Sequence, residues 1–308
     1  VSSISNLAKS MRIPYFTSST TTFSSPMSSI QGHRVAAVTG ANKGIGFYIA
    51  LQLASSGLFR NIILGCRDPD RGQAAVREIT NQLVGGMDTP IPEISYLPLE
   101  VGNSSSHSDF KQKIEKNFGK LDVLVNNAAT AFKGSDPTPF QDQTKPTLDI
   151  NFRGTIDLTC ELLPLIRKGS DARIVNVASM AGRLNQIKSK ELRDQFSSSD
   201  LTLSELRNLV NDFENDVRSG VHSKKGWGSS NYGMSKLALI AATKVMAREE
   251  EGAGVKVNCL CPGYCDTDMT SHLGTKSAAD GAKTATLLAT MENCPTGAYF
   301  TEMQPGVW

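Results

Sequence analysis

A tyrosine and a lysine four positions apart, Tyr232 and Lys236, are the first pair in this sequence that could carry out chemistry. Residues at i and i+4 share one face of a helix, so both side chains would project toward the same ligand. A free tyrosine hydroxyl has a pKa of about 10, which is too high for easy proton exchange at neutral pH. The ammonium group of Lys236 would favour the phenolate and lower the pKa of Tyr232. The pair therefore predicts a general acid or base.

A serine, Ser179, follows an apolar run that is typical of a buried strand. Its hydroxyl could donate a hydrogen bond to a carbonyl oxygen and stabilise the negative charge that forms there on reduction. Taken alone, the serine could simply end a strand in a loop, and Tyr-x-x-x-Lys occurs by chance on many helices. Their placement favours function, because the active sites of open α/β sheets form beyond the carboxyl ends of the strands.

A glycine-rich segment at residues 39–46 reads T-G-A-N-K-G-I-G. It follows a short apolar run and opens a helical pattern, which is the context that a phosphate-binding turn requires. The alternative, a merely flexible loop, does not require this context. Glycines allow a tight turn and a close approach to a pyrophosphate, and the helix N-terminus offers free N–H groups. The segment predicts a dinucleotide cofactor that is bound by Gly40, Asn42, Lys43, Gly44, Ile45 and Gly46.

The type of nucleotide is indicated at the end of the second predicted strand, where the chain reads Cys66-Arg67. A site that is selective for NAD places an acidic residue there to hold the ribose 2′-hydroxyl. Arg67, joined by Lys43, could instead bind a 2′-phosphate through charge-assisted hydrogen bonds. The alternative is that Arg67 is a solvated surface arginine. The pattern favours NADPH/NADP+ as the cofactor.

Short apolar runs alternate with helical patterns from Arg34 onward, which is typical of an α/β fold with a doubly wound, mostly parallel sheet of the Rossmann type. Buried parallel strands read as continuous apolar runs, as in Val123, Leu124 and Val125. Seven strands are predicted at 35–38, 61–66, 94–97, 121–126, 174–178, 255–260 and 298–300. Helices are predicted at 44–56, 71–83, 106–118, 145–166 and 232–251.

A long segment before the helix at Tyr232, residues 183–228, interrupts this alternation and exceeds an ordinary connection. Thr202 and Glu205 match a capping box, and apolar residues follow at helical spacing, which predicts a helix with one apolar face. This helical insertion could cover its own patch of core, or it could form a wall or lid over the substrate site. The second interpretation is favoured, because long ordered insertions beside active sites often act as lids.

The composition is that of an ordinary globular protein, with 308 residues, 39% hydrophobic residues and a net charge of +2. The unbroken alternation suits one domain over residues 31–308. The sequence lacks the excess of basic residues that would indicate nucleic-acid binding. It also lacks the run of about 18 apolar residues that a membrane span requires. The six cysteines do not suggest disulfides, and Cys259, Cys261 and Cys265 lack the spacing of a zinc site. We expect a small-molecule partner, a reducing compartment and no metal.

Residues 1–30 are rich in Ser and Thr and contain Lys9 and Arg12 but no acidic residue. The composition predicts a disordered segment and matches an organellar transit peptide. The alternative is a leader that is not part of the natural protein, either because it is not translated or because it was added artificially. The predicted location is the cytoplasm, or an organelle if the segment is a transit peptide.

Together these motifs resemble those of the short-chain dehydrogenases/reductases, and specifically of the monomeric NADPH-dependent carbonyl reductases. The resemblance spans residues 34–308, and it includes C-R-D at 66–68, N-N-A at 126–128 and C-P-G-Y-C-D-T-D-M at 261–269. It implies reduction of a ketone, aldehyde or quinone to an alcohol by hydride transfer from NADPH. The insertion matches the monomeric subgroup, so a monomer is predicted.

The resemblance also assigns roles to single residues. Tyr232 would be the acid, Lys236 would also bind the nicotinamide ribose, and Ser179 would polarise the substrate carbonyl. Asn151 would complete a tetrad and support a proton-relay water near the lysine. Cys261 would lie close to the substrate pocket. The remaining cofactor contacts would be Asn127 beside the adenosine, Glu100 and Val101 near the adenine, and Pro262, Gly263 and Thr267 at the nicotinamide end.

Two positions depart from the family pattern, and two other functions remain open. Ala129 replaces the usual glycine of N-N-A-G, and Glu100 replaces the commoner aspartate. The protein could be a dehydrogenase/reductase of one defined terpenoid, steroid or alkaloid, because pocket shape decides the substrate. It could also be an NADPH sensor without turnover, although a sensor would be expected to lose Tyr232 or Lys236.

Overall fold

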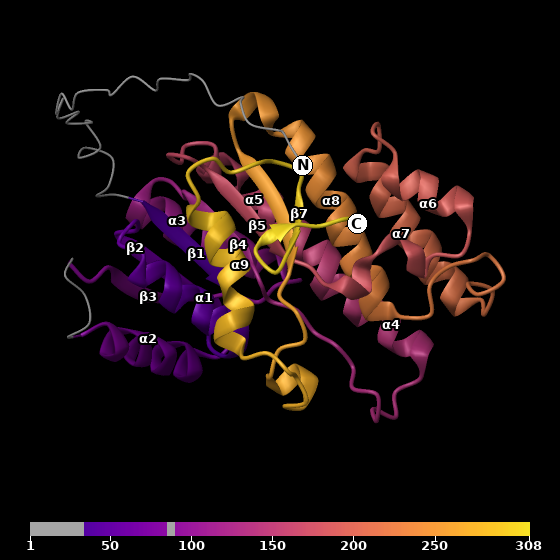
Figure 1. Cartoon of the computed structure of the whole chain (residues 1–308), viewed down its shortest axis with the longest axis horizontal. Coiled ribbons are helices and arrows are strands. Elements are labelled where there is room, and N and C mark those ends of the chain that lie inside the picture. The colour runs from indigo at the N-terminus through magenta and orange to yellow at the C-terminus, as the bar shows by residue number, and fades with distance from the viewer. Residues whose placement is uncertain (1–33, 85–89) are drawn as a thin grey trace, which may run out of the picture. The chain divides into compact units, whose positions relative to one another are not determined.

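The computed structural model describes residues 34–84 and 90–308, so the predicted leader at 1–30 lies outside the described residues. An eight-stranded sheet has the order β3-β2-β1-β4-β5-β6-β7-β8 (Figure 1). All neighbours are parallel except β7 and β8. The strands are β1 (Val35–Thr39), β2 (Asn61–Cys66), β3 (Glu93–Pro98), β4 (Val123–Asn126), β5 (Arg173–Val177), β6 (Lys256–Cys261), β7 (Tyr299–Thr301) and β8 (Gln304–Pro305).

The doubly wound sheet that the sequence predicts is confirmed, and all seven predicted strands are present. The eighth strand, β8, was not predicted, because two residues are too few to show an apolar pattern. The strand order reverses between β1 and β4. In open α/β sheets this switch point is where ligands bind, at the carboxyl ends of the strands.

The two faces of the sheet carry separate halves of the core. Ala36 and Val38 of β1 pack with α1 (Gly44–Ser55), α2 (Pro69–Leu83) and α9 (Ala278–Thr290). Val35 and Ala37 point to the opposite face and pack with α3 (Ser104–Phe118), α5 (Thr155–Ile166) and α8 (Asn231–Glu249). Burial on both faces explains why the strands read as continuous apolar runs.

Helix α9 was not predicted, although it packs against α1. The side chain of Gln52 on α1 donates to the carbonyl oxygen of Ala279 and accepts from the hydroxyl of Thr286, both at 2.8 Å. The sequence of α9 is dominated by small residues, which form no strong apolar stripe along the helix. One signal was available: the hydroxyl of Ser277 caps the helix by accepting from the backbone N–H of Asp280 at 3.0 Å.

The predicted helix at 145–166 consists of three segments. Helix α4 (Phe140–Leu148) leads into a π-helical segment, Asp149–Gly154, and then into α5. A Cβ atom on Gly154 would lie 2.5 Å from the backbone nitrogen of Gly102, so the close approach of these two backbones requires glycine. Such π segments are frequent at functional sites, and this one carries Asn151.

The insertion contains α6 (Lys190–Ser197) and α7 (Leu203–Arg218), and α7 begins with the predicted capping box. Helix α7 lies against α4 and α8 (Figure 1), and its buried residue Phe213 belongs to the same core cluster as residues of α5 and α8. The two helices therefore cover a patch of core, which was the less favoured interpretation. One end of the insertion does reach the α8 N-terminus, because Gln186 donates to the carbonyl oxygen of Gly233 at 3.1 Å.

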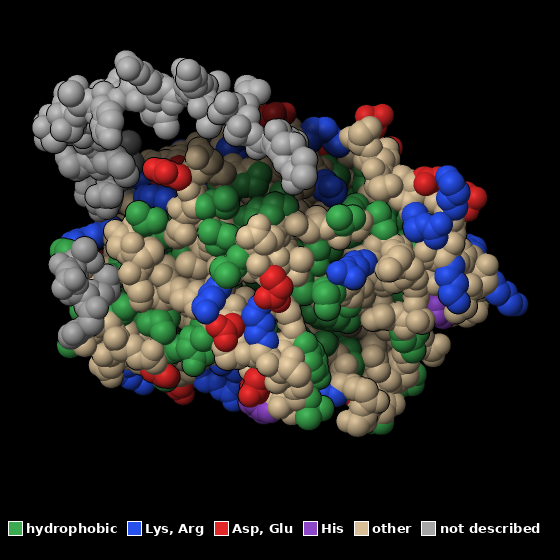
Figure 2. Space-filling view, viewed as in Figure 1, with side chains coloured by type: hydrophobic (Ala, Val, Ile, Leu, Met, Phe, Trp, Pro, Cys, Tyr) green, Lys and Arg blue, Asp and Glu red, His purple; other side chains and the backbone are tan. Residues whose placement is uncertain are grey.

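The surface is mixed in charge on the face that Figure 2 shows, where positive and negative side chains are interspersed. Within residues 34–84 and 90–308, no helix has the length and apolar content that crossing a bilayer needs.

Candidate active site

Tyr232, Lys236 and Ser179 lie together at the carboxyl end of β5. Helix α8 is capped by Ser230, whose hydroxyl accepts from the N–H of Gly233 at 2.9 Å, and this cap sets Tyr232 in the first turn. The buried ammonium group of Lys236 donates to the carbonyl oxygen of Val177, the last residue of β5, at 2.7 Å. Its Nζ lies 5.7 Å from the centroid of the Tyr232 ring. The helix and the strand end are thus joined through Lys236.

The surroundings shift the pKa values of this pair in directions that the sequence did not indicate. Burial raises the pKa of the Tyr232 phenol to about 12, a hydrogen bond with Ser179 opposes the rise, and nearby Cys261 adds to it. The lowering predicted from the Lys236 ammonium group is therefore wrong for this structure. Burial also lowers the pKa of Lys236 to about 8. Desolvation disfavours the charged form of both groups, and it is the largest cause of each shift.

Asn151 is buried in the π-helical segment, and both polar atoms of its side chain form hydrogen bonds. Its amide oxygen accepts from the backbone N–H of Thr130 at 2.8 Å, and its amide nitrogen donates to the carbonyl oxygen of Thr130 at 2.8 Å. The nitrogen also donates to the hydroxyl of Ser235 at 3.0 Å, and Ser235 donates to the carbonyl oxygen of Tyr232 at 2.7 Å. Asn151 therefore links the loop after β4 to the first turn of α8.

The glycine-rich turn joins β1 to α1 in the shape that a phosphate site needs. Gly40 and Gly44 adopt positive φ angles of 64° and 57°. Among residues 34–84 and 90–308, no side chain caps α1, and the first turn of this helix holds no acidic residue. The helix N-terminus therefore presents the positive end of its dipole. Asn42 and Ile45 are partly exposed within the turn. A phosphate group fits these features.

Asn127 holds the turn in place from the end of β4. Its side chain donates to the carbonyl oxygens of Thr39 at 2.9 Å and Gly40 at 3.2 Å. A Cβ atom on Gly46 would lie 2.4 Å from the Asn127 side-chain nitrogen, so the contact leaves no room for a larger residue. The structure thus gives Asn127 a role in supporting the turn, and its place beside the adenosine stays a prediction.

Arg67 and Lys43, the residues predicted to bind a 2′-phosphate, are both exposed at the carboxyl side of the sheet. Arg67 follows β2 directly and forms no ion pair with any residue of 34–84 or 90–308. Lys43 forms an ion pair with Asp268 of the loop after β6. The structure therefore shows Lys43 engaged with a protein carboxylate, a contact that the sequence did not indicate.

Glu100 and Val101, which the resemblance places near the adenine, follow β3. The carboxylate of Glu100 is exposed and accepts from the side chain of Asn103 at 3.3 Å. Val101 is partly buried against the core beneath α3 and α5. They lie beyond the carboxyl end of an outer strand of the sheet, and β2 with Arg67 is the neighbouring strand.

The loop after β6 lies against the glycine-rich turn. A Cβ atom on Gly44 would be 3.5 Å from the methyl group of Thr267. Gly263 has a φ of 87°, which favours glycine. The thiol of Cys261 accepts from the backbone N–H of Met180 at 3.2 Å and of Gly263 at 3.4 Å. Cys261 therefore joins the loop that begins with Pro262 to the turn after Ser179.

Cys259, Cys261 and Cys265 are buried, with two on β6 and one in the loop, as their interpretation as a strand end and its loop predicts. All six cysteines carry free thiols. Across residues 34–84 and 90–308, no group of three or more His, Cys, Asp or Glu side chains is arranged to hold a metal ion.

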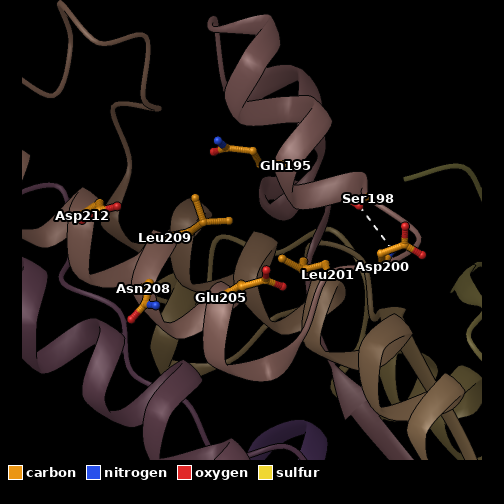
Figure 3. A pocket seen from close by; sticks show the side chains of 8 residues that line it. All are labelled: Gln195, Ser198, Asp200, Leu201, Glu205, Asn208, Leu209 and Asp212. Carbon is orange, nitrogen blue, oxygen red and sulfur yellow. Dashed lines mark hydrogen bonds between the residues drawn. The ribbon is translucent and has the colours of Figure 1, made fainter.

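A pocket of about 350 Å³ lies between α6 and α7 in the insertion (Figure 3). Its side chains are mostly polar or acidic, and they include none of the predicted catalytic or cofactor residues. The pocket offers no nucleophile paired with a base, so we assign the chemistry to the β5–α8 site. The lining residues are Gln195, Ser198, Asp200, Leu201, Glu205, Asn208, Leu209 and Asp212.

The sheet order and the glycine-rich turn define a Rossmann-type dinucleotide-binding fold. A family model described as short chain dehydrogenase matches residues 34–190 and 216–278. The unmatched residues between them include most of α6 and α7. Carbonyl reductase (NADPH) 1 of Macaca fascicularis is 39% identical over 287 residues, covering 90% of this chain and 99% of the relative. The human protein of that name is 38% identical over 286 residues, with the same coverage. The chain belongs to the short-chain dehydrogenase family.

Two solved structures share this fold over most of their length. Salutaridine reductase from Papaver somniferum aligns with a TM-score of 0.77 and 29% identity, covering 87% of this chain and 99% of that one. Menthone neomenthol reductase from Mentha piperita aligns with a TM-score of 0.74 and 27% identity, covering 88% of this chain and 99% of that one.

Proposed function

We propose that this protein is an NADP-dependent oxidoreductase that reduces the carbonyl group of a ketone, aldehyde or quinone to an alcohol. The observation that carries the proposal is the convergence of Ser179, Tyr232 and Lys236 at the carboxyl end of β5. This set has a hydrogen-bond donor, a proton donor and a buried ammonium group, which are the groups that reduction of a carbonyl requires. The identity to carbonyl reductases over nearly the whole chain supports the reaction class.

In the proposed mechanism Tyr232 is the general acid. With a pKa of about 12 its hydroxyl is protonated at neutral pH, so it can donate a proton to the carbonyl oxygen. Ser179 donates a hydrogen bond to the same oxygen and stabilises its developing charge. Lys236 stabilises the phenolate that Tyr232 leaves behind. NADPH, when bound, supplies the hydride to the carbonyl carbon.

The cofactor would lie across the carboxyl edge of β1, β2, β4 and β6. The turn of Gly40, Gly44 and Gly46 and the uncapped N-terminus of α1 would hold its pyrophosphate. Arg67, with Lys43, would bind the 2′-phosphate. The other proposed contacts are Asn42, Ile45, Glu100, Val101 and Asn127 toward the adenosine, and Lys236, Pro262, Gly263 and Thr267 toward the nicotinamide.

Consumption of NADPH, followed by its absorbance, tests this function directly. Quinones, aromatic aldehydes and aliphatic ketones would be offered in turn, with NADH as the control cofactor. We expect turnover with NADPH on several of these carbonyls and much slower turnover with NADH. NADPH binding without turnover on any carbonyl of this panel would contradict reduction of a broad range of carbonyls, and it would favour an NADPH sensor or a reductase of one narrow substrate.

The pH dependence of the reaction is expected to follow Lys236 rather than Tyr232. Lys236 has a lowered pKa of about 8, so its ammonium form is lost as the pH rises through that value. Tyr232 stays protonated over the same range. The kcat/KM for NADPH, which reports ionisations of the free enzyme, should therefore be constant below about pH 7 and fall about ten-fold per unit above pH 8. A profile that stays flat to pH 10 would contradict this assignment.

A narrower substrate is the second candidate. Two of the structures that this chain resembles belong to reductases whose names state particular compounds, salutaridine in one and menthone and neomenthol in the other. Pocket shape rather than the catalytic set decides between broad and narrow reductases. A broad enzyme would turn over many of the carbonyls in the panel, whereas a narrow one would respond to one terpenoid, steroid or alkaloid ketone.

We further propose a monomer in which residues 31–308 form one domain. The insertion supports this, because α7 covers the outer surface of α4 and α8 and the side chain of Arg153 donates to Glu214 of α7 at 2.7 Å. A second subunit could not pack on that surface without displacing α7.

A further inference from the structure

We propose that Trp308 is a positioning residue of the active site, whose indole fastens the turn after Ser179 to the catalytic helix α8. The inference rests on the proposed function, because it concerns the placement of the Ser179 hydroxyl beside Tyr232. Trp308 is far from these residues in sequence and belongs to no motif, so no sequence pattern indicates the contact.

The first contact is between the indole and the turn itself. The Nε1–H of Trp308 donates to the carbonyl oxygen of Gly182 at 2.8 Å. Gly182 ends the short helical turn Met180–Gly182, which Ser179 caps by accepting from the N–H of Ala181 at 3.1 Å. The indole therefore holds the carboxyl end of a turn whose other end carries the Ser179 hydroxyl.

The turn is pressed directly onto the backbone of α8. A Cβ atom on Gly182 would lie 2.7 Å from the carbonyl carbon of Lys236 and 2.8 Å from the nitrogen of Leu237. Such distances leave no space for any side chain, so the two backbones are in contact at the residue that bears the catalytic ammonium group. An interaction that holds Gly182 in place therefore also fixes the position of Ser179, at the other end of the turn, relative to Lys236.

The second contact of the indole is with α8 itself. The ammonium group of Lys244, two turns beyond Lys236, lies 5.7 Å from the centroid of the Trp308 ring. The ring also packs on the buried cluster of Ala178, Cys261 and Tyr299 behind the site. The neighbouring Val307 is 87% exposed, so the indole rather than that side chain anchors this segment. Trp308 thus bridges α8 and the Ser179 turn.

A matched pair of tryptophan variants tests the proposal. The chain has two tryptophans, and each donates its indole N–H to a protein oxygen. Trp227 donates to Asp216 at 2.8 Å, and both residues belong to the insertion rather than to the predicted catalytic set. Trp308→Phe and Trp227→Phe therefore each remove one indole hydrogen bond, at two different places in the structure. The measurements are kcat, the Kd for NADPH by fluorescence titration, and amide hydrogen exchange.

Trp308→Phe is expected to lower kcat about ten-fold, because small displacements of a catalytic group have large effects on rate. The Kd for NADPH should stay within about two-fold, since the glycine-rich turn is untouched. Exchange should become faster in peptides that cover residues 179–183. Trp227→Phe should leave kcat within about two-fold and speed exchange only around residues 213–227.

Unchanged kcat, or unchanged exchange at residues 179–183, in Trp308→Phe would overturn the proposal. Faster exchange throughout the sheet with weaker NADPH binding would overturn it as well, because that pattern indicates general loosening. If Trp308→Phe does not fold, Lys244→Met removes the cation beside the ring and should act in the same direction with a smaller effect. Absence of turnover in the unaltered protein would instead contradict the proposed function, and hydrogen exchange would still decide whether Trp308 fastens the turn.

Discussion

Replacing Tyr232 by Phe is expected to lower kcat for carbonyl reduction by roughly 10²–10⁴-fold, which is the range that a positioned general acid contributes. The ring and its packing beside Lys236 are kept, and only the hydroxyl that donates the proton is lost. The Kd for NADPH should change little. Steady-state kinetics with a saturating carbonyl, together with fluorescence titration of NADPH, measure both quantities.

Tyr96→Phe on β3 provides the matched control. The hydroxyl of Tyr96 is buried and has no hydrogen-bond partner among residues 34–84 and 90–308, so its removal should leave kcat unchanged. A Tyr232→Phe variant that keeps more than a tenth of the original kcat would show that another group supplies the proton. The Tyr232→Phe effect should also be larger than that of Trp308→Phe, since one removes the acid and the other only displaces its neighbour.

Removal of the two cations at the predicted 2′-phosphate site should have the second largest effect. A hydrogen bond to a charged group contributes about 1.5–3 kcal/mol, so Arg67→Met should weaken NADPH binding by roughly 10- to 100-fold. Lys43→Met should have a smaller effect, because its ammonium group already pairs with Asp268 in this structure. Together the two changes should bring the Kd for NADPH close to that for NADH.

The affinity for NADH serves as the internal control, since NADH has no 2′-phosphate. Arg77→Met removes one exposed charge from the middle of α2 and should leave both affinities unchanged. Fluorescence titration of each variant with both nucleotides gives its Kd for NADPH and its Kd for NADH. Equal losses of NADPH and NADH affinity in Arg67→Met would argue that Arg67 supports the fold of the site rather than contacting a phosphate.

Much of the fold and part of the site could be predicted from sequence, because both are encoded in local patterns. Apolar runs locate the seven predicted strands, and in β1, β4 and β5 burial on both faces demands such runs. The glycine-rich turn has a fixed sequence, because only glycine adopts the φ angles of Gly40 and Gly44 without strain. The spacing of Tyr232 and Lys236 indicates a shared helix face, which follows from the helical repeat alone.

Other features depend on which distant segments meet, and the tertiary structure alone decides them. The pKa of Tyr232 is raised rather than lowered, because the extent of burial is not encoded in the Tyr-x-x-x-Lys spacing. The helices of the insertion cover part of the hydrophobic core, because apolar residues of α4 and α8 face them. The contact of Trp308 with Gly182 joins residues 126 positions apart. By itself the sequence determined the residue types that could do the chemistry and the sheet that carries them. Their burial, hydrogen-bond partners and mutual support arise only when the chain is packed, because these are properties of neighbours in space.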